Sequence, residues 1–186
     1  MSSQKSNLRL NEYDFYPTPS WCYENLDIDW TLFKNAHEPC RGDGRIQTFL
    51  QNKGIPTTHS ELREGKDFFD WDDKVDLILT NPPFSIAKEF VDHSISHSKT
   101  VVMLLRLNFL GSKTRHSWWN FNKPTSLYIL SQRPTFTGKG TDSTEYAWFV
   151  WDKTNRIPSG THFVKPPSKE QIQKDKESCK IALSKI

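Results

Sequence analysis

The 186-residue chain contains few cysteines, and their spacing argues against two classes of site. Cys22, Cys40 and Cys179 are its three cysteines, and no two of them form a Cys-x-x-Cys pair. An odd number of cysteines cannot pair completely, and disulfide frameworks and zinc sites use closely spaced ones. His93 and His97 also stand at no metal-ligand spacing with a cysteine. We therefore expect free thiols and no bound metal.

Long apolar runs are absent as well. The longest, "TVVMLLRLNFL" (100–110), is interrupted by Arg106 and is too short to cross a bilayer. The first residues, "MSSQKSNLRLNEYD", lack the apolar core of a secretory signal. We expect a cytoplasmic protein that does not bind membranes. Its length suits one domain with a substantial core.

Acidic residues are absent from one long stretch. Between His93 and Thr141 there are seven lysines and arginines and no aspartate or glutamate. The preceding segment, from Ser60 to Asp92, has nine acidic residues against four basic ones. This asymmetry indicates an anionic partner. The last segment, 153–186, is also basic, with eight basic and three acidic residues, but its mixed charge is typical of a solvated helix.

Hydrophobic periodicity predicts alternating strands and helices. We expect a helix to begin within 17–26, helices at 44–54 and 85–97, and strands at 31–39, 55–60, 75–80, 100–107, 126–132 and 145–153. No helical pattern separates the last two strands, so they are expected to form an antiparallel hairpin at one edge. The predicted fold is α/β, with a mostly parallel sheet and helices on both faces.

The segment "NPPF" (Asn81–Phe84) follows the apolar run "VDLIL" after a single residue, Thr80. Proline has no N–H to donate and a fixed φ, so two prolines end the strand and hold its last side chains rigidly. Ligands of open α/β sheets bind outside the carboxyl ends of the strands. A stiff loop there can present an amide and an aromatic ring to a planar substrate.

A second motif, "EPCRGDG" (38–44), comes about forty residues earlier. It lacks the third glycine of the dinucleotide fingerprint, but Gly42 and Gly44 in a tight turn still allow close approach of a ligand. Glu61, after the second predicted strand, can accept hydrogen bonds from ribose hydroxyls. Asp67 precedes two phenylalanines, which combines a polar contact with the apolar wall that a purine requires.

Taken in order, "FYPTP" (15–19), "EPCRGDG", Glu61, "DFF" (67–69) and "NPPF" resemble the class I S-adenosylmethionine-dependent methyltransferases. The chain is most similar to the amino-group methylases, above all the DNA adenine N6-methyltransferases of phage and restriction type. The resemblance covers roughly residues 14 to 151 and implies a Rossmann-like sheet. It implies that the cofactor S-adenosylmethionine contacts Tyr16, Thr18, Glu38, Pro39, Gly42, Gly44, Glu61, Asp67, Phe68 and Asn81.

Within that set, the resemblance places Tyr16 and Thr18 beside the methionine part of the cofactor, Glu61 at its ribose and Asp67 at its adenine. Catalysis is assigned to Asn81, Pro82, Pro83 and Phe84. The segment between Glu61 and Asp67 is shorter than the helix usual at this place in the family.

The resemblance implies methylation of the exocyclic amino group of adenine in DNA. Methylation of RNA adenine or of a protein glutamine, and a non-catalytic nucleic-acid-binding protein on the same fold, are the alternatives. We expect substrate contacts from Lys113, Arg115, Trp118, Arg133 and Lys139.

The expected organisation is one catalytic domain (1–152), with recognition insertions at 106–124 and 131–145, and a basic extension (153–186). The protein is expected to be a monomer or homodimer, in the host cytoplasm if it comes from a phage.

Overall fold

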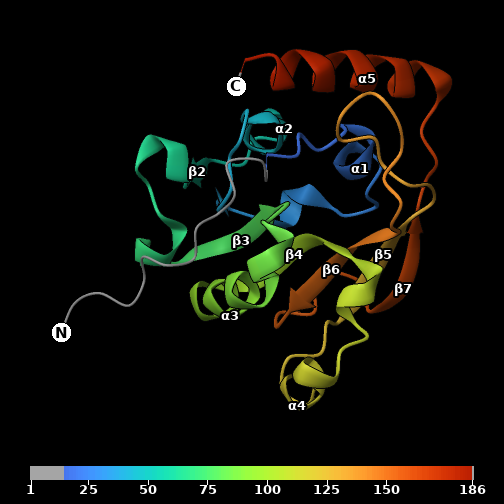
Figure 1. Ribbon diagram of the computed structural model, residues 1–186. Helices are drawn as coiled ribbons and strands as arrows, with labels where there is room; N and C mark the ends of the chain where they lie inside the picture. Colours follow the sequence, from blue (N-terminus) through green and yellow to red (C-terminus); the bar gives the residue numbers. More distant parts are fainter. Residues whose placement is uncertain (1–14, 186) are drawn as a thin grey trace.

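A computed structural model describes residues 15–185 and shows one seven-stranded sheet in the order β2-β1-β3-β4-β6-β5-β7 (Figure 1). The strands are β1 (Ala36–Glu38), β2 (Thr57–His59), β3 (Val75–Thr80), β4 (Ser98–Arg106), β5 (Ser126–Leu130), β6 (Tyr146–Asp152) and β7 (Gly160–Val164). The helices are α1 (Trp21–Glu24), α2 (Arg45–Asn52), α3 (Ala87–His97), α4 (His116–Trp119) and α5 (Lys169–Leu183). None of them is long and apolar enough to span a bilayer.

The sheet is mostly parallel, as predicted. β1, β2, β3 and β4 pair in parallel, and β6 runs antiparallel between β4 and β5. The predicted antiparallel pairing of β5 with β6 is therefore confirmed. Its predicted place at the edge is wrong, because β7 pairs in parallel with β5 and forms the edge itself.

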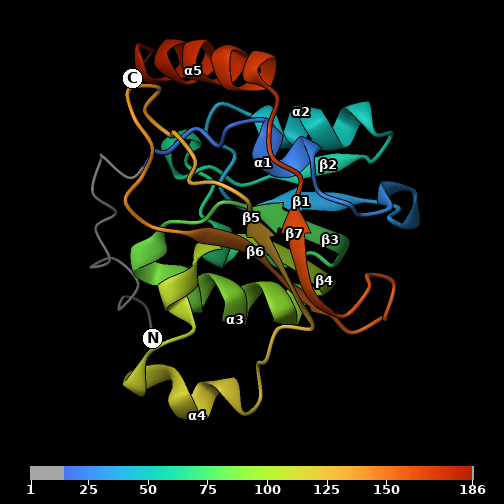
Figure 2. The same cartoon turned by 90° about the vertical axis from the view of Figure 1, so that its right-hand side faces the viewer.

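Helices cover both faces of the sheet, which confirms the prediction. Helices α1, α2 and α5 lie over one face and α3 and α4 over the other, with α4 standing farther off (Figures 1 and 2). Alternate residues of β3 pack into two hydrophobic cores, one on each face of the sheet. Leu77 and Leu79 belong to the core beneath α1 and α2, and Ile78 belongs to the core beneath α3. This is the period-two pattern of a strand that is buried on both faces.

Residues 153–186, predicted as a basic extension, contribute β7 and α5 to the fold. The buried carboxylate of Asp175 on α5 accepts hydrogen bonds from the backbone N–H groups of Ser20 (2.7 Å) and Trp21 (3.2 Å) at the start of α1. Cys179 is also buried. One side of α5 is exposed, and its buried side fixes α1 through Asp175.

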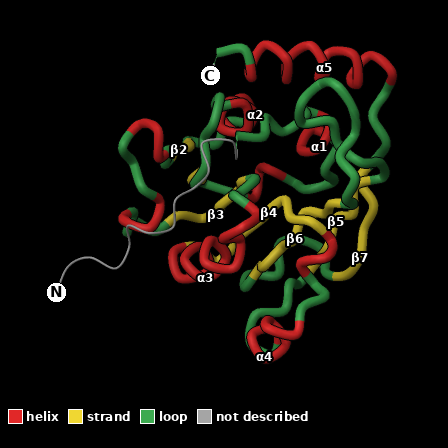
Figure 3. Tube along the Cα trace, viewed as in Figure 1, coloured by secondary structure: helices red, strands yellow, loops and turns green. Residues whose placement is uncertain are grey.

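Long loops connect the later strands (Figure 3). The loop between β5 and β6 runs toward α5 and packs against it, because a Cβ placed on Gly138 would lie 2.5 Å from the carbonyl oxygen of Lys176. The loop between β5 and β6 is therefore anchored on α5.

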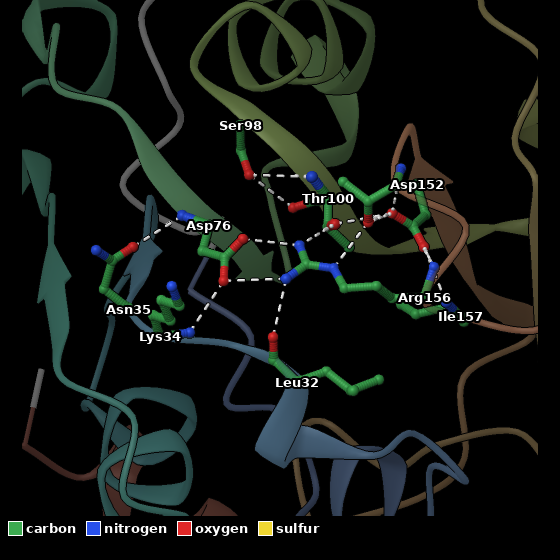
Figure 4. Close-up of polar contacts among 10 residues, drawn as sticks. Leu32, Lys34, Asn35, Asp76, Ser98, Thr100, Asp152, Arg156 and Ile157 are labelled. Atoms are coloured by element: carbon green, nitrogen blue, oxygen red, sulfur yellow. Dashed lines mark hydrogen bonds and ion pairs between the residues drawn. The ribbon is translucent and has the colours of Figure 1, made fainter.

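A polar network fixes the end of the sheet where β3 and β4 begin (Figure 4). The buried carboxylate of Asp152 accepts hydrogen bonds from the hydroxyl of Thr100 (2.9 Å) and the backbone N–H of Ile157 (2.8 Å). Arg156 forms an ion pair with Asp76 at 2.7 Å. These contacts attach the turn after β6 to the amino ends of β3 and β4 and leave the opposite ends free for a site.

Candidate active site

A cavity of about 310 Å³ lies at the carboxyl ends of β1 and β3. Its lining comes from four stretches: 15–18, 38–45, 61–69 and 81–90. Nine of the ten predicted cofactor residues line it, and the exception is Gly44, which forms the N-cap of α2. The structure thus brings the separate motifs of the sequence together around one space, and their contact with a cofactor remains a prediction.

The glycine turn packs closely on neighbouring groups. Gly42 has φ +55°, and a Cβ on it would lie 2.8 Å from the ring of Phe15. Its backbone N–H donates a hydrogen bond of 2.7 Å to Oε2 of Glu61. Only glycine satisfies both the positive φ and the close approach.

Glu61 is held against this turn by its own carboxylate. Oε1 accepts a hydrogen bond of 3.2 Å from the backbone N–H of Arg63, and so caps the 3-10 helix Leu62–Glu64. This single turn occupies the segment in which the methyltransferases that the sequence resembles usually have a longer helix. A carboxylate can accept about four hydrogen bonds, so Glu61 retains capacity for a ligand.

Glu38 ends β1 with a carboxyl group that is 1% exposed. Its Oε2 has no hydrogen-bond partner among residues 15–185. Burial raises the pKa of this carboxyl well above its ordinary value. A buried carboxyl oxygen without a partner is costly, and a ligand with hydroxyl or ammonium groups would relieve that cost.

An aromatic stack forms the far wall of the cavity. Phe68 stacks on Phe90 with ring centroids 5.2 Å apart and on His37 at 5.8 Å. Beside this wall, Oδ1 of Asp67 accepts a hydrogen bond of 2.9 Å from the backbone N–H of Phe69. A flat apolar surface next to a carboxylate suits a purine with an amino group.

His37 packs against this wall and was not predicted, because no motif in the sequence includes it. Its ring lies 3.9 Å from that of Trp71, nearly parallel. Its two nitrogens contact the hydroxyls of Thr58 (2.8 Å) and Ser60 (2.9 Å). Burial, with smaller effects of two other histidines, lowers the pKa of His37 to about 3, so the ring is neutral at physiological pH.

Asn81 follows β3 and has a defined amide orientation. Its Nδ2 donates to the hydroxyl of Thr18 (3.0 Å) and to the backbone carbonyl of Tyr16 (3.4 Å). A carbonyl can only accept, so the NH₂ group must face it. Oδ1 is buried and has no partner within the described residues, which leaves one rigid acceptor for an incoming donor.

A second cavity, of about 380 Å³, adjoins the first. Tyr16 lines both, and the second also includes Phe84, Arg106 and Arg115. The ring of Tyr16 stacks on that of Phe84, with centroids 6.3 Å apart and an angle of 22° between the planes. The NPPF loop therefore stands between two spaces, as a site for two reactants requires.

Neither a protein-family model nor a curated protein sequence matches this chain. Solved structures do. A Pyrococcus horikoshii protein provisionally named an RNA methyltransferase superposes with a TM-score of 0.52 at 14% identity, over 67% of this chain and 78% of its own. A Listeria monocytogenes protein provisionally named a class I S-adenosylmethionine-dependent methyltransferase gives 0.51 at 10% identity, over 80% of this chain and 65% of its own.

The chain has the class I methyltransferase fold. In this fold, the predicted catalytic residues take distinct places: Pro82 is buried, Pro83 lines the first cavity and Phe84 lines the second. Their roles in catalysis remain predictions.

The predicted substrate residues are scattered over the methyltransferase fold. Arg115 lines the second cavity, whereas Lys113, Trp118, Arg133 and Lys139 line neither cavity. The indole N–H of Trp118 donates to Asp92 on α3 at 2.7 Å, so this side chain anchors its loop.

Arg106 lines the second cavity but was not among the predicted substrate residues. It is the charged residue at the carboxyl end of the buried run 100–107, and that position was the available signal. Among the described residues, no group of three His, Cys, Asp or Glu side chains could hold a metal ion.

Proposed function

We propose that this protein transfers the methyl group of S-adenosylmethionine to the exocyclic amino nitrogen of adenine in DNA. The observation that carries the proposal is the unpartnered, buried Oδ1 of Asn81, which lines the first cavity. It is an oriented acceptor with no function in holding the fold. A substrate amino group would supply the missing donor.

The first cavity fits the cofactor in its chemistry. S-adenosylmethionine supplies an electrophilic methyl group on a positively charged sulfur when it is bound. Glu38 and Glu61 provide carboxylate oxygens for hydroxyl and ammonium groups. Asp67 and Phe68 provide an acceptor and a flat wall for the adenine ring. Gly42, with no Cβ, keeps the floor of the cavity open.

The chain's own residues act on the amino group of the substrate. The lone pair of an aryl amine is delocalised into its ring, so the nitrogen is a weak nucleophile. When Oδ1 of Asn81 and the backbone carbonyl of Pro82 each accept one N–H, the nitrogen becomes more pyramidal and its lone pair more available. The prolines fix both acceptors before reaction, which is electrostatic preorganisation.

Adenine in DNA is favoured because the second cavity combines aromatic rings with arginines. Tyr16 and Phe84 can stack on a base that has left the duplex. Arg106 and Arg115 provide positive charge for its backbone. RNA adenine is the second candidate, since a protein of the same fold is named for RNA. A protein glutamine would use this charge less well. Nucleic-acid binding without catalysis would use the charge equally, and the methyl-transfer test below distinguishes it.

The test is incubation with labelled S-adenosylmethionine and separate pools of DNA, RNA and protein, followed by mass analysis. We expect N6-methyladenine in DNA. Label found only in RNA or only in protein glutamine would show that DNA is not the substrate. Cofactor binding without label in any pool would contradict catalysis.

A further inference from the structure

The second cavity carries a positive charge that its own lining does not balance. Arg106 and Arg115 both line it, and no acidic residue does. Neither arginine belongs to an ion pair within residues 15–185. Outside the lining, Asp142 acts on Arg106 through its negative charge. The charge of the lining itself remains positive, and positive charge in a concave site attracts anions and raises their local concentration.

Both arginines are held in the same way. Nε of Arg106 donates to the hydroxyl of Tyr146 at 3.2 Å, and its guanidinium lies 4.9 Å from the ring centre of Phe84. Nε of Arg115 donates to the backbone carbonyl of Phe109 at 3.0 Å, and its guanidinium lies 4.4 Å from the ring of the same residue.

In each case a hydrogen bond and a ring fix the guanidinium plane. The terminal nitrogens, Nη1 and Nη2, make no hydrogen bond to any described residue. A guanidinium has five donors in a rigid fork that matches phosphate oxygens. The two guanidinium groups are therefore oriented before a ligand binds, and their terminal N–H groups are available to it.

The hydroxyl of Tyr146 is fixed as the acceptor of the hydrogen bond from Arg106. The same hydroxyl donates to Oδ2 of Asp142 at 3.1 Å. Burial raises the pKa of Tyr146 to about 12, so the phenol keeps its proton. With that proton directed at Asp142, the phenolic oxygen is left to accept from Arg106.

We propose that Arg106 and Arg115 bind the two backbone phosphates that flank the methylated nucleotide. The inference rests on the proposed function, because it assumes that the substrate amino group enters through the second cavity. A nucleotide within a strand carries a phosphate on each side, which balances both arginines. A glutamine side chain is neutral and would leave both charges unpaired in the cavity.

The experiment measures binding of the full chain to a short fluorescent DNA duplex over a series of salt concentrations, with the cofactor present. Each phosphate contact contributes about 0.9 to the slope of log affinity against log salt. Arg106→Gln and Arg115→Gln should each lower the slope by about that amount. Arg106→Lys and Arg115→Lys should retain it, which separates charge from lost packing.

The matched control is Lys99→Gln. Lys99 is exposed and belongs to the same acid-free stretch, but it lies near the amino end of β4, whereas Arg106 lies at the carboxyl end. Its slope should equal that of the unmodified protein. An unchanged slope in both arginine variants, an equal loss in Lys99→Gln, or no binding of the duplex at low salt would overturn the proposal.

Methyl transfer and cofactor binding are measured on the same samples, so the two proposals fail separately. If the arginine variants have lower slopes but no N6-methyladenine is formed, the phosphate contacts are supported and the proposed reaction is contradicted. If N6-methyladenine is formed and the slopes are unchanged, the reaction is supported and the phosphate contacts are contradicted. Tighter binding of the matching RNA duplex would overturn the assignment of these contacts to DNA.

Discussion

At the scale of single residues, the candidate site is defined by the atoms that the fold leaves without partners. Six buried side-chain nitrogen or oxygen atoms among the described residues lack a hydrogen bond, and three belong to Glu38, Thr80 and Asn81. Each such atom costs about 1–3 kcal/mol. Under the proposed function, ligands complete the bonds of Glu38 and Asn81, which line the first cavity, whereas Thr80 lines neither cavity.

Gly42→Ala should weaken cofactor binding at least tenfold, or about 1.4 kcal/mol. The new Cβ would meet Phe15 at 2.8 Å, and the positive φ adds strain. Gly54→Ala is the matched control, because it has φ +80° but nothing within 4 Å. Both should lose about 1–2 kcal/mol of stability, but only Gly42→Ala should lose affinity in calorimetry. Equal cofactor affinities would mean that the glycine turn does not contact the cofactor.

His37 should make the protein sensitive to acid. Its pKa is about 3 when folded, against an ordinary value of 6.5. Between these values the unfolded chain binds one more proton, so the free energy of unfolding falls as the pH falls, by up to about 1.4 kcal/mol per pH unit. Denaturation of His37→Phe over pH 4 to 6.5 should show a smaller slope. His162→Asn, remote from the wall, should leave the slope unchanged, and an unchanged slope in His37→Phe would refute the assignment.

At the scale of elements, the Asp152 network holds the sheet at the end opposite the site. Asp152→Asn should lower the free energy of unfolding by about 3 kcal/mol, because it weakens a buried, fully bonded carboxylate. Cofactor affinity should hardly change, since the network lies at the amino ends of β3 and β4. Asp73→Asn, at an exposed position, should be neutral within about 0.5 kcal/mol. A loss of affinity equal to the loss of stability would contradict this separation.

The elements differ in how well the sequence predicted them. Residues 44–54 and 85–97 have clear helical periodicity and form α2 and α3, while 75–80 and 100–107 are apolar runs that form β3 and most of β4. β7 was missed because it is short and largely exposed. Periodicity marks a strand but not its neighbour, so the insertion of β6 between β4 and β5 could not be inferred from the pattern.

At the scale of the whole molecule, the acid-free stretch 93–141 was expected to serve an anionic partner, and only part of it lies at the second cavity. Lys99 and Arg106 stand near opposite ends of β4, about 23 Å apart at the usual rise per residue. Charge counted along a chain does not tell which end of a strand a residue occupies. The motifs before residue 91 were predicted more completely, because strand ends at one edge of a parallel sheet converge in space.

The molecule should recognise only a short sequence of about two to four bases. Base contacts were expected from two segments, 106–124 and 131–145. Trp118 anchors the first on α3, and the second packs on α5 at Gly138. Few side chains therefore remain for base contacts. Sequencing of methylated adenines on a randomised duplex pool tests this, and a strict site of about six or more base pairs from a demonstrated monomer would refute it.

The central claim is that Asn81 acts on the amino group of the substrate, and Asn81→Ala tests it most directly. Single-turnover transfer to DNA and calorimetric binding of S-adenosylmethionine are measured on the same preparation. We predict that transfer falls by about 10²–10³-fold or more, far more than cofactor affinity, because the lost acceptor faces the amino group. Transfer at close to the original rate would contradict the mechanism.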